Sequence, residues 1–167
     1  MAGKVIFHKA MPPATLAAQI GLITGASTPV EKIMVWDFDP ATVEYMDFLC
    51  RLEGYNAGGL TFTFIWASGA TTGNCIWSIG IRRIPDDAED LDTTAFTYDY
   101  NNVTDTTASA AGEVSMPTLA FTDGADMDSW ADGEWAIIRV RRFASDASDT
   151  LDSNDARLIS LAGAETT

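Results

Sequence analysis

Two rows of large apolar side chains between Leu60 and Ile84 restrict the fold of this chain more than any other feature. The first row is Leu60, Phe62, Phe64 and Trp66, and the second is Cys75, Trp77, Ile79 and Ile81. Strand side chains alternate between two faces, so each row forms the buried face of a half-buried strand. The link between the strands, residues 67–74, is rich in Gly, Ser and Thr and too short for a parallel crossover. We therefore expect the two strands to be antiparallel partners.

Similar alternation elsewhere in the chain raises the number of predicted strands to about eight. They span residues 30–38, 42–53, 60–66, 75–84, 93–100, 113–122, 134–143 and 156–161. Pro117 predicts an edge or a bulge, and residues 101–112, rich in Thr, Ser and Ala, predict an exposed loop. This number and spacing of strands are typical of a jelly roll. We predict an all-β fold, an antiparallel two-sheet jelly-roll sandwich.

The first 28 residues differ in character from the rest of the chain. Pro12 and Pro13 lack the backbone donors that a central strand needs, and small residues follow them. We expect an extended N-terminal arm over residues 1–28, the jelly-roll domain over residues 29–162, and a short tail over residues 163–167. A floppy terminus and an arm that lies on a neighbouring subunit or partner surface are both compatible with this sequence.

Charge excludes two classes of partner. The chain carries 24 acidic and 10 basic residues, a formal net charge of −14, which repels phosphate backbones and anionic lipid. We expect neither nucleic acid nor a membrane surface as a partner. The segment Met1 to Ala10 lacks the apolar run of a signal peptide, and no run approaches the length of a membrane span. We expect synthesis in a cytosol and a soluble product.

The residue types argue against an enzyme. His8 is the sole histidine and lies in the predicted arm, so a Ser-His-Asp triad, a Cys-His pair and a multi-histidine metal site are all excluded. Cys50 and Cys75 lie in strand patterns, which favours buried free thiols over a disulfide. We assign no catalytic residue, no cofactor and no metal ligand.

Acidic loops leave a structural cation open as an alternative. Two loops are candidates, residues 123–132 and residues 146–155, each with four aspartates. Neither loop has the spacing of an EF-hand, and capping of turns is the simpler interpretation of such residues.

Arginines on the strands are candidates for contacts. Arg82, Arg139 and Arg141 lie on strands that we expect side by side in a jelly roll. Such a cluster requires carboxylate partners, either from loops of the same chain or from a neighbouring subunit. Both alternatives stay open.

Five tryptophans raise the question of sugar binding. We assign Trp66, Trp77 and Trp135 to core rows, whereas Trp130 lies in an acidic loop where we expect it to be exposed. Trp130 is therefore the candidate glycan-binding residue.

Several short motifs occur in an order that resembles a known family. They are Trp36-Asp-Phe-Asp39, Leu60-Thr-Phe-Thr-Phe-Ile-Trp66, Gly73-Asn-Cys-Ile-Trp77, Gly133-Glu-Trp-Ala-Ile-Ile-Arg-Val-Arg-Arg142 and Asp149-Thr-Leu-Asp-Ser-Asn-Asp-Ala156. From about Val30 to Leu161 the chain resembles small jelly-roll virion structural proteins of tailed bacteriophages. The resemblance implies a trimer that serves as a head decoration (cement) protein or as a module of a tail or head appendage. It brings no catalytic residues.

The expectation for function is a capsid decoration protein on the capsid exterior of the virion, made in the host bacterial cytoplasm. It binds the major capsid protein as a homotrimer and stabilises the lattice. We expect partner contacts from the arm and the strand arginines: Val5, Ile6, Phe7, Met11, Pro12, Pro13, Arg82, Arg139 and Arg141. The alternative is a receptor- or glycan-binding module that uses Trp130.

Overall fold

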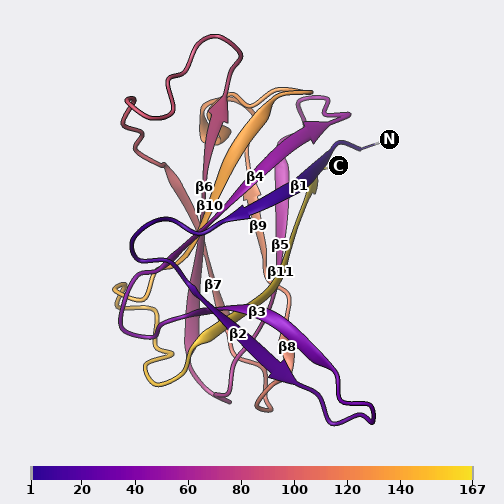
Figure 1. Cartoon of the computed structure of the whole chain (residues 1–167), viewed down its shortest axis with the longest axis vertical. Helices are drawn as coiled ribbons and strands as arrows, with labels where there is room; N and C mark the ends of the chain where they lie inside the picture. Colours follow the sequence, from indigo (N-terminus) through magenta and orange to yellow (C-terminus); the bar gives the residue numbers. More distant parts are fainter. Residues whose placement is uncertain (1, 167) are drawn as a thin grey trace.

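Eleven β-strands and one short 3-10 helix make up the regular structure of residues 2–166 in this computed structural model (Figure 1). The elements are β1 (Lys4–Met11), β2 (Gln19–Thr24), β3 (Lys32–Phe38), β4 (Tyr45–Glu53), β5 (Leu60–Ala67), β6 (Asn74–Ile84), β7 (Tyr100–Thr106), β8 (Val114–Ser115), β9 (Thr118–Phe121), η1 (Ala125–Met127), β10 (Trp135–Arg142) and β11 (Ala156–Glu165). All pairs between these strands are antiparallel. The predicted all-β class is confirmed.

The strands form one branched sheet that is sandwich-like in cross-section. Its main path runs β2-β3-β11-β1-β4-β10-β6-β7, while β5 pairs with β11 and carries β8 and β9. The branch lies in β11, where residues 156–158 pair with β3 and residues 157–165 pair with β5. This branching places β5 opposite β6 across the interior rather than beside it.

Aromatic side chains from β5 and β6 meet in the core. The Trp77 ring lies 5.4 Å from the Phe64 ring, 5.8 Å from the Trp66 ring and 5.1 Å from the Phe38 ring, measured between centroids. All four side chains are buried, as the alternation predicted for Phe64, Trp66 and Trp77. The expected pairing of these two strands is wrong, because β6 pairs with β10 and β7 instead. Apolar alternation specifies which face of a strand is buried, and contact across a core satisfies it as well as pairing does.

An aspartate connects strands on opposite sides of the core. Asp105 of β7 accepts a hydrogen bond from Trp66 Nε1 at 2.8 Å and from Ser115 Oγ at 2.6 Å, both at its Oδ2 atom. Nearby, the Asn101 side chain donates to the Ala120 carbonyl at 3.0 Å. These bonds draw β7 towards β8 and β9 and narrow the opening between the two ends of the sheet.

The N-terminal residues differ from their prediction. Residues 4–11, expected in an extended arm, form β1 and pair with β4 from Lys4 with Glu53 to Met11 with Asp47. Val5 is 6% exposed and belongs to the core. The predicted boundary at residue 28 is therefore wrong for this segment, because the prolines that suggested an arm follow β1 and leave its backbone donors intact.

Two further boundaries also differ. Of the strand predicted over residues 93–100, residues 93–99 are irregular, and β7 begins at its last residue, Tyr100, and continues into the stretch predicted as a loop. The predicted tail begins inside β11, which continues to Glu165, while Thr167 lies outside the described residues. The expected interruption at Pro117 is confirmed, since β8 ends at Ser115 and β9 begins at Thr118.

A buried ion pair fixes one end of the sandwich. Arg142, at the end of β10, is 0% exposed, and its guanidinium donates to both carboxylate oxygens of Asp149 at 3.1 and 2.7 Å. The same guanidinium donates to the carbonyls of Asn154 and Leu151 at 3.0 and 2.6 Å. Asp149 also accepts the Ile76 backbone N–H at 3.0 Å. One charged group thereby connects β10, β6 and the loop before β11.

Removing this arginine should destabilise the fold strongly. Arg142→Ala leaves a buried carboxylate without its countercharge and several carbonyls without their donor, so the free energy of unfolding should fall by about 3–5 kcal/mol in urea denaturation. The matched control is Arg157→Ala, because Arg157 is 40% exposed in its side chain and lies 3.5 Å from Asp37. Its cost should stay below about 1 kcal/mol. Equal costs for the two variants would contradict the role given to Arg142.

Candidate functional site

A projecting hairpin carries most of the exposed apolar side chains of the described chain. It consists of β2, the residues that lead into it from Leu16, the connection to β3 and the first residues of β3, and Figure 1 shows the hairpin extending away from the other strands. Six large apolar residues between 44% and 64% exposed gather there, against four in the remainder of residues 2–166. The six are Leu16, Ile20, Leu22, Val30, Ile33 and Met34. We call residues 16–34 the hairpin arm.

Both faces of the hairpin arm are apolar. Leu22 pairs with Met34 on one face, and Ile23 pairs with Ile33 on the other. A strand pair at a protein surface ordinarily hides one apolar face and exposes a polar one. In addition, β2 ends the main path of the sheet, so its outer edge pairs with no strand among residues 2–166. An apolar edge of this kind is a template for association with another chain.

The hairpin arm differs in charge from the rest of the chain. No charged residue occurs between Pro12 and Val30, and Glu31 and Lys32 cancel each other, although the whole chain carries −14. Burying the exposed half of six such side chains is worth roughly 1 kcal/mol each, or about 6 kcal/mol before the entropic cost of association. Large exposed apolar patches of this kind mark interaction sites.

The residues predicted for partner contacts at the N-terminus lie apart from the hairpin arm. Val5 packs in the core, and Ile6, Phe7 and Met11 are half-buried within β1. Pro12 is exposed and Pro13 is half-buried in the connection that leads to β2. The exposed apolar surface thus begins about where the predicted contact segment ends.

The arginines meet carboxylates of the same chain. Arg139 of β10 donates from Nε and Nη2 to the two oxygens of Asp47 at 2.7 and 2.6 Å, and this carboxylate raises the pKa of Arg139. Its guanidinium carbon lies 4.5 Å from the Tyr98 ring centroid and 5.5 Å from that of Tyr45. Arg82 forms an ion pair with Glu89. The intrachain alternative therefore holds for Arg139 and Arg82.

Arg141 has a different environment. Its guanidinium carbon lies 3.8 Å from the Tyr100 ring centroid and 4.2 Å from the Phe143 ring centroid. Its Nε atom is buried and finds no hydrogen-bond partner within residues 2–166. Two rings stabilise this cation in place of a carboxylate.

The segment between β6 and β7 covers these arginines. Figure 1 shows it leaving the end of β6 and returning alongside the sheet to β7. Gly80 makes this close approach possible, because a Cβ there would lie 2.9 Å from Cβ and Cδ1 of Tyr98. The covered end of the sheet face is thereby closed to a partner.

Tyr98 gives this covering segment a measurable pH response. Burial raises the pKa of Tyr98 to about 12. The unfolded chain has a tyrosine pKa near 10, so the stabilisation by neutral Tyr98 is complete below about pH 10 and is lost as the pH rises towards 12. Urea unfolding from pH 8 upwards should show this decline, and Tyr98→Phe should make it shallower. An unchanged slope in Tyr98→Phe would contradict the burial of this phenol in the folded state.

Two tryptophans differ from their predicted burial, one being buried and the other partly exposed. Trp130 is 1% exposed and donates from Nε1 to the Glu134 carbonyl at 2.9 Å, so the expectation of an exposed glycan-binding face is wrong. Trp135, assigned to the core, is 37% exposed and packs against His8 with ring centroids 4.6 Å apart and ring planes tilted by 47°. The inward row of β10 is Ala136, Ile138, Val140 and Arg142. Because this inward row ends in Arg142, the apolar pattern of the sequence did not identify it as the buried face of β10.

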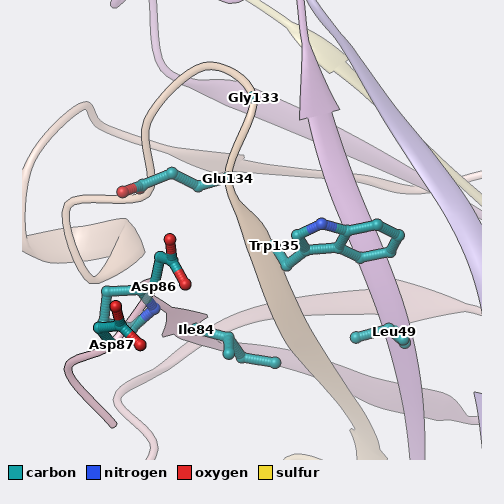
Figure 2. A pocket seen from close by; sticks show the side chains of 8 residues that line it. Leu49, Ile84, Asp86, Asp87, Gly133, Glu134 and Trp135 are labelled. Carbon is teal, nitrogen blue, oxygen red and sulfur yellow. The ribbon is translucent and has the colours of Figure 1, made fainter.

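A pocket of about 650 Å³ opens beside Trp135. Figure 2 shows Trp135 and Leu49 on one side of it, the carboxylates of Asp86, Asp87 and Glu134 on the other, and Ile84 between them. Pro85 and Gly133 complete the lining. The Trp135 backbone pairs with Ile84, and β4, which carries Leu49, pairs with β10. Strands β4, β10 and β6 therefore supply the apolar floor, and the turns beyond β10 and β6 supply the acids.

The acidic loops serve the protein's own backbone. Asp126 accepts from the Thr122 N–H at 2.6 Å, Asp132 from the Tyr55 N–H at 3.0 Å and Asp128 from the Arg83 N–H at 2.8 Å. Asp149 pairs with Arg142. Within residues 2–166 no group of three or more His, Cys, Asp or Glu side chains is placed to hold a metal ion. These contacts are those of loop capping.

The two thiols have the environment predicted for them. Cys50 and Cys75 are free and buried, and burial raises the pKa of both. Neither presents a thiolate to solvent at neutral pH.

No family model and no curated protein sequence matches this chain. No helix within residues 2–166 combines the length and the apolar character that crossing a membrane requires. The features on which a function can be argued are therefore the chain's own surfaces.

The sequence contains a signal for the hairpin arm but none for the pocket beside Trp135. The hairpin arm is detectable as the long uncharged stretch that begins at Pro12 and includes alternating Ile20 and Leu22. The pocket depends on which face of β10 points inward, and both faces of its first half are apolar.

Proposed function

We propose that this protein is a structural component of a virion, a decoration protein that binds the outside of a tailed-phage head as a homotrimer. The observation that carries the proposal is the hairpin arm, which carries apolar side chains on both faces, most of them exposed, and whose outer edge pairs with no strand among residues 2–166. An exposed apolar surface of this size is typical of a site of association with another protein. The jelly-roll resemblance, from about Val30 to Leu161, supplies the class of assembly.

Stabilisation of a capsid follows from selective binding. A protein that binds the assembled lattice and not its separated subunits stabilises the lattice by mass action. The hairpin arm provides about 6 kcal/mol of apolar burial for this purpose, and its lack of net charge avoids repulsion by an acidic neighbour. The sandwich supplies a rigid base for the arm through β11, which pairs with β3.

The receptor- or glycan-binding alternative has less support. It relied on stacking of a sugar on Trp130, and that ring is enclosed by the protein. The arm, in contrast, is exposed along most of its length. The observations therefore favour the decoration protein.

Polar substitutions in the hairpin arm test the proposal. The triple variant Ile20→Thr, Leu22→Thr, Met34→Thr should remain folded, because these side chains are exposed and threonine suits a strand. It should lose most of its binding to expanded phage heads in a sedimentation assay and most of its self-association in analytical ultracentrifugation.

The matched control changes exposed apolar residues outside the arm. Leu91→Thr, Val114→Thr, Met116→Thr alters side chains of comparable exposure and should leave binding unchanged. Loss of binding in the control, or full binding in the arm variant, would refute the role of the hairpin arm.

Copy number tests the virion assignment directly. Quantitative mass spectrometry of purified virions should give a ratio to the major capsid protein near one, because a decoration protein occupies repeating lattice sites. A ratio many-fold lower would indicate a tail or vertex appendage. Absence from virions would rule out both.

A further inference from the structure

The pocket beside Trp135 combines two features that one ligand class satisfies. Its floor is apolar and partly exposed, from Trp135, Leu49 and Ile84, and its rim carries Asp86, Asp87 and Glu134. An apolar ligand would leave the negative charge of the carboxylates unpaired, and a small inorganic cation would leave the apolar floor exposed to water. A cation on a hydrocarbon stem contacts both.

The rim remains negative after its own arginines are counted. Arg83 pairs with Glu134 at 3.4 Å, and Arg51 donates to the Gly133 carbonyl at 3.1 Å while it pairs with Glu53. Neither Asp86 nor Asp87 forms an ion pair with any of residues 2–166. Two adjacent uncompensated carboxylates thus face an exposed indole.

We propose that this pocket binds a lysine or arginine side chain carried by an extended segment of a partner protein. The stem lies on Trp135 and Leu49, and the charged end reaches Asp86 and Asp87. A volume of about 650 Å³ lies in the range of ligand sites and leaves room for residues that flank the basic side chain. The net charge of −14 attracts a basic segment from a distance. The inference is independent of the virion assignment.

The exposed indole is the second observation that separates this pocket from an ordinary acidic loop. Trp66, Trp77 and Trp130 are each at most 1% exposed, whereas Trp135 is 37% exposed and packs against His8. A large aromatic face kept in water beside carboxylates is the arrangement that recognises organic cations.

Peptide titration tests the proposal. The probe is a short acetylated and amidated peptide with two lysines among alanines, and the readout is the Trp135 indole N–H signal in NMR, assigned with Trp135→Phe. The signal should shift in a saturable manner, and affinity should fall as salt increases. The same peptide with acetylated lysines keeps the stems without the charges and should not bind.

Two double variants locate the site. Asp86→Asn with Asp87→Asn should weaken binding about tenfold, because the two carboxylates share one basic group and their removal costs one good charge contact. Asp99→Asn with Asp152→Asn makes the same charge change at exposed positions outside the pocket and should alter affinity less than about twofold.

Three results would overturn the proposal. Equal weakening by both double variants would indicate attraction by net charge alone. Equal binding of the acetylated peptide would indicate an apolar groove. A shift of the Trp135 signal by N-acetylglucosamine, with none by the lysine peptide, would indicate a sugar site.

Discussion

The buried pair of Arg142 and Asp149 is the interaction on which the arrangement of this sandwich depends. A guanidinium removed from water requires nearly all of its donors to be satisfied, and here the carboxylate and two carbonyls from the loop before β11 do so. That requirement fixes the loop against the end of β10. It also fixes β11, since this strand begins directly after the loop, and β11 in turn carries both β3 and β5. The branch of the sheet therefore rests on a polar contact, while the aromatic core around Trp77 supplies most of the buried apolar area.

The outer face of β4, β10 and β6 is divided into a closed and an open half. In the closed half, Tyr98 and Tyr100 lie over Arg139 and Arg141, which is possible because Gly80 leaves room for the returning chain. In the open half, the same face ends at Trp135, which packs against His8 and stays 37% exposed. The segment that protects one half thus also forms the rim of the other, through Asp86 and Asp87. Cation–aromatic contact occurs within the chain in the closed half, and we propose the same chemistry, with a partner's cation, in the open half.

Much of this fold follows from alternation alone, and the errors have identifiable physical causes. The strands that include Phe62, Trp77 and Cys50 were predicted with nearly correct bounds, because their inward rows are uniformly apolar. The inward face of β10 was misjudged because it ends in Arg142, a residue type that is buried only when paired, and pairing is invisible in a sequence. β7 was missed because its exposed threonines and asparagines resemble a loop, and its strand conformation comes from pairing with β6. The hairpin arm appears in the sequence only as an uncharged stretch, because alternation identifies an apolar face and does not tell whether that face is covered in the folded protein.

The separation of charge from apolar surface decides how copies of this protein can meet. Bodies that carry most of a net charge of −14 repel one another, whereas the uncharged stretch from Pro12 to Val30 brings no repulsion to a contact. Association is thereby directed to the hairpin arm and away from the acidic loops. The pocket differs from the arm, because its proposed attraction for a basic segment depends on the negative field of the protein, the same field that makes two copies repel each other. Salt screens the repulsion between the acidic bodies and also the attraction of the pocket for a basic segment. Higher salt should therefore favour contacts made by the arm and weaken those made by the pocket. The two binding surfaces that we propose therefore depend on different physical properties, apolar burial for the arm and charge for the pocket.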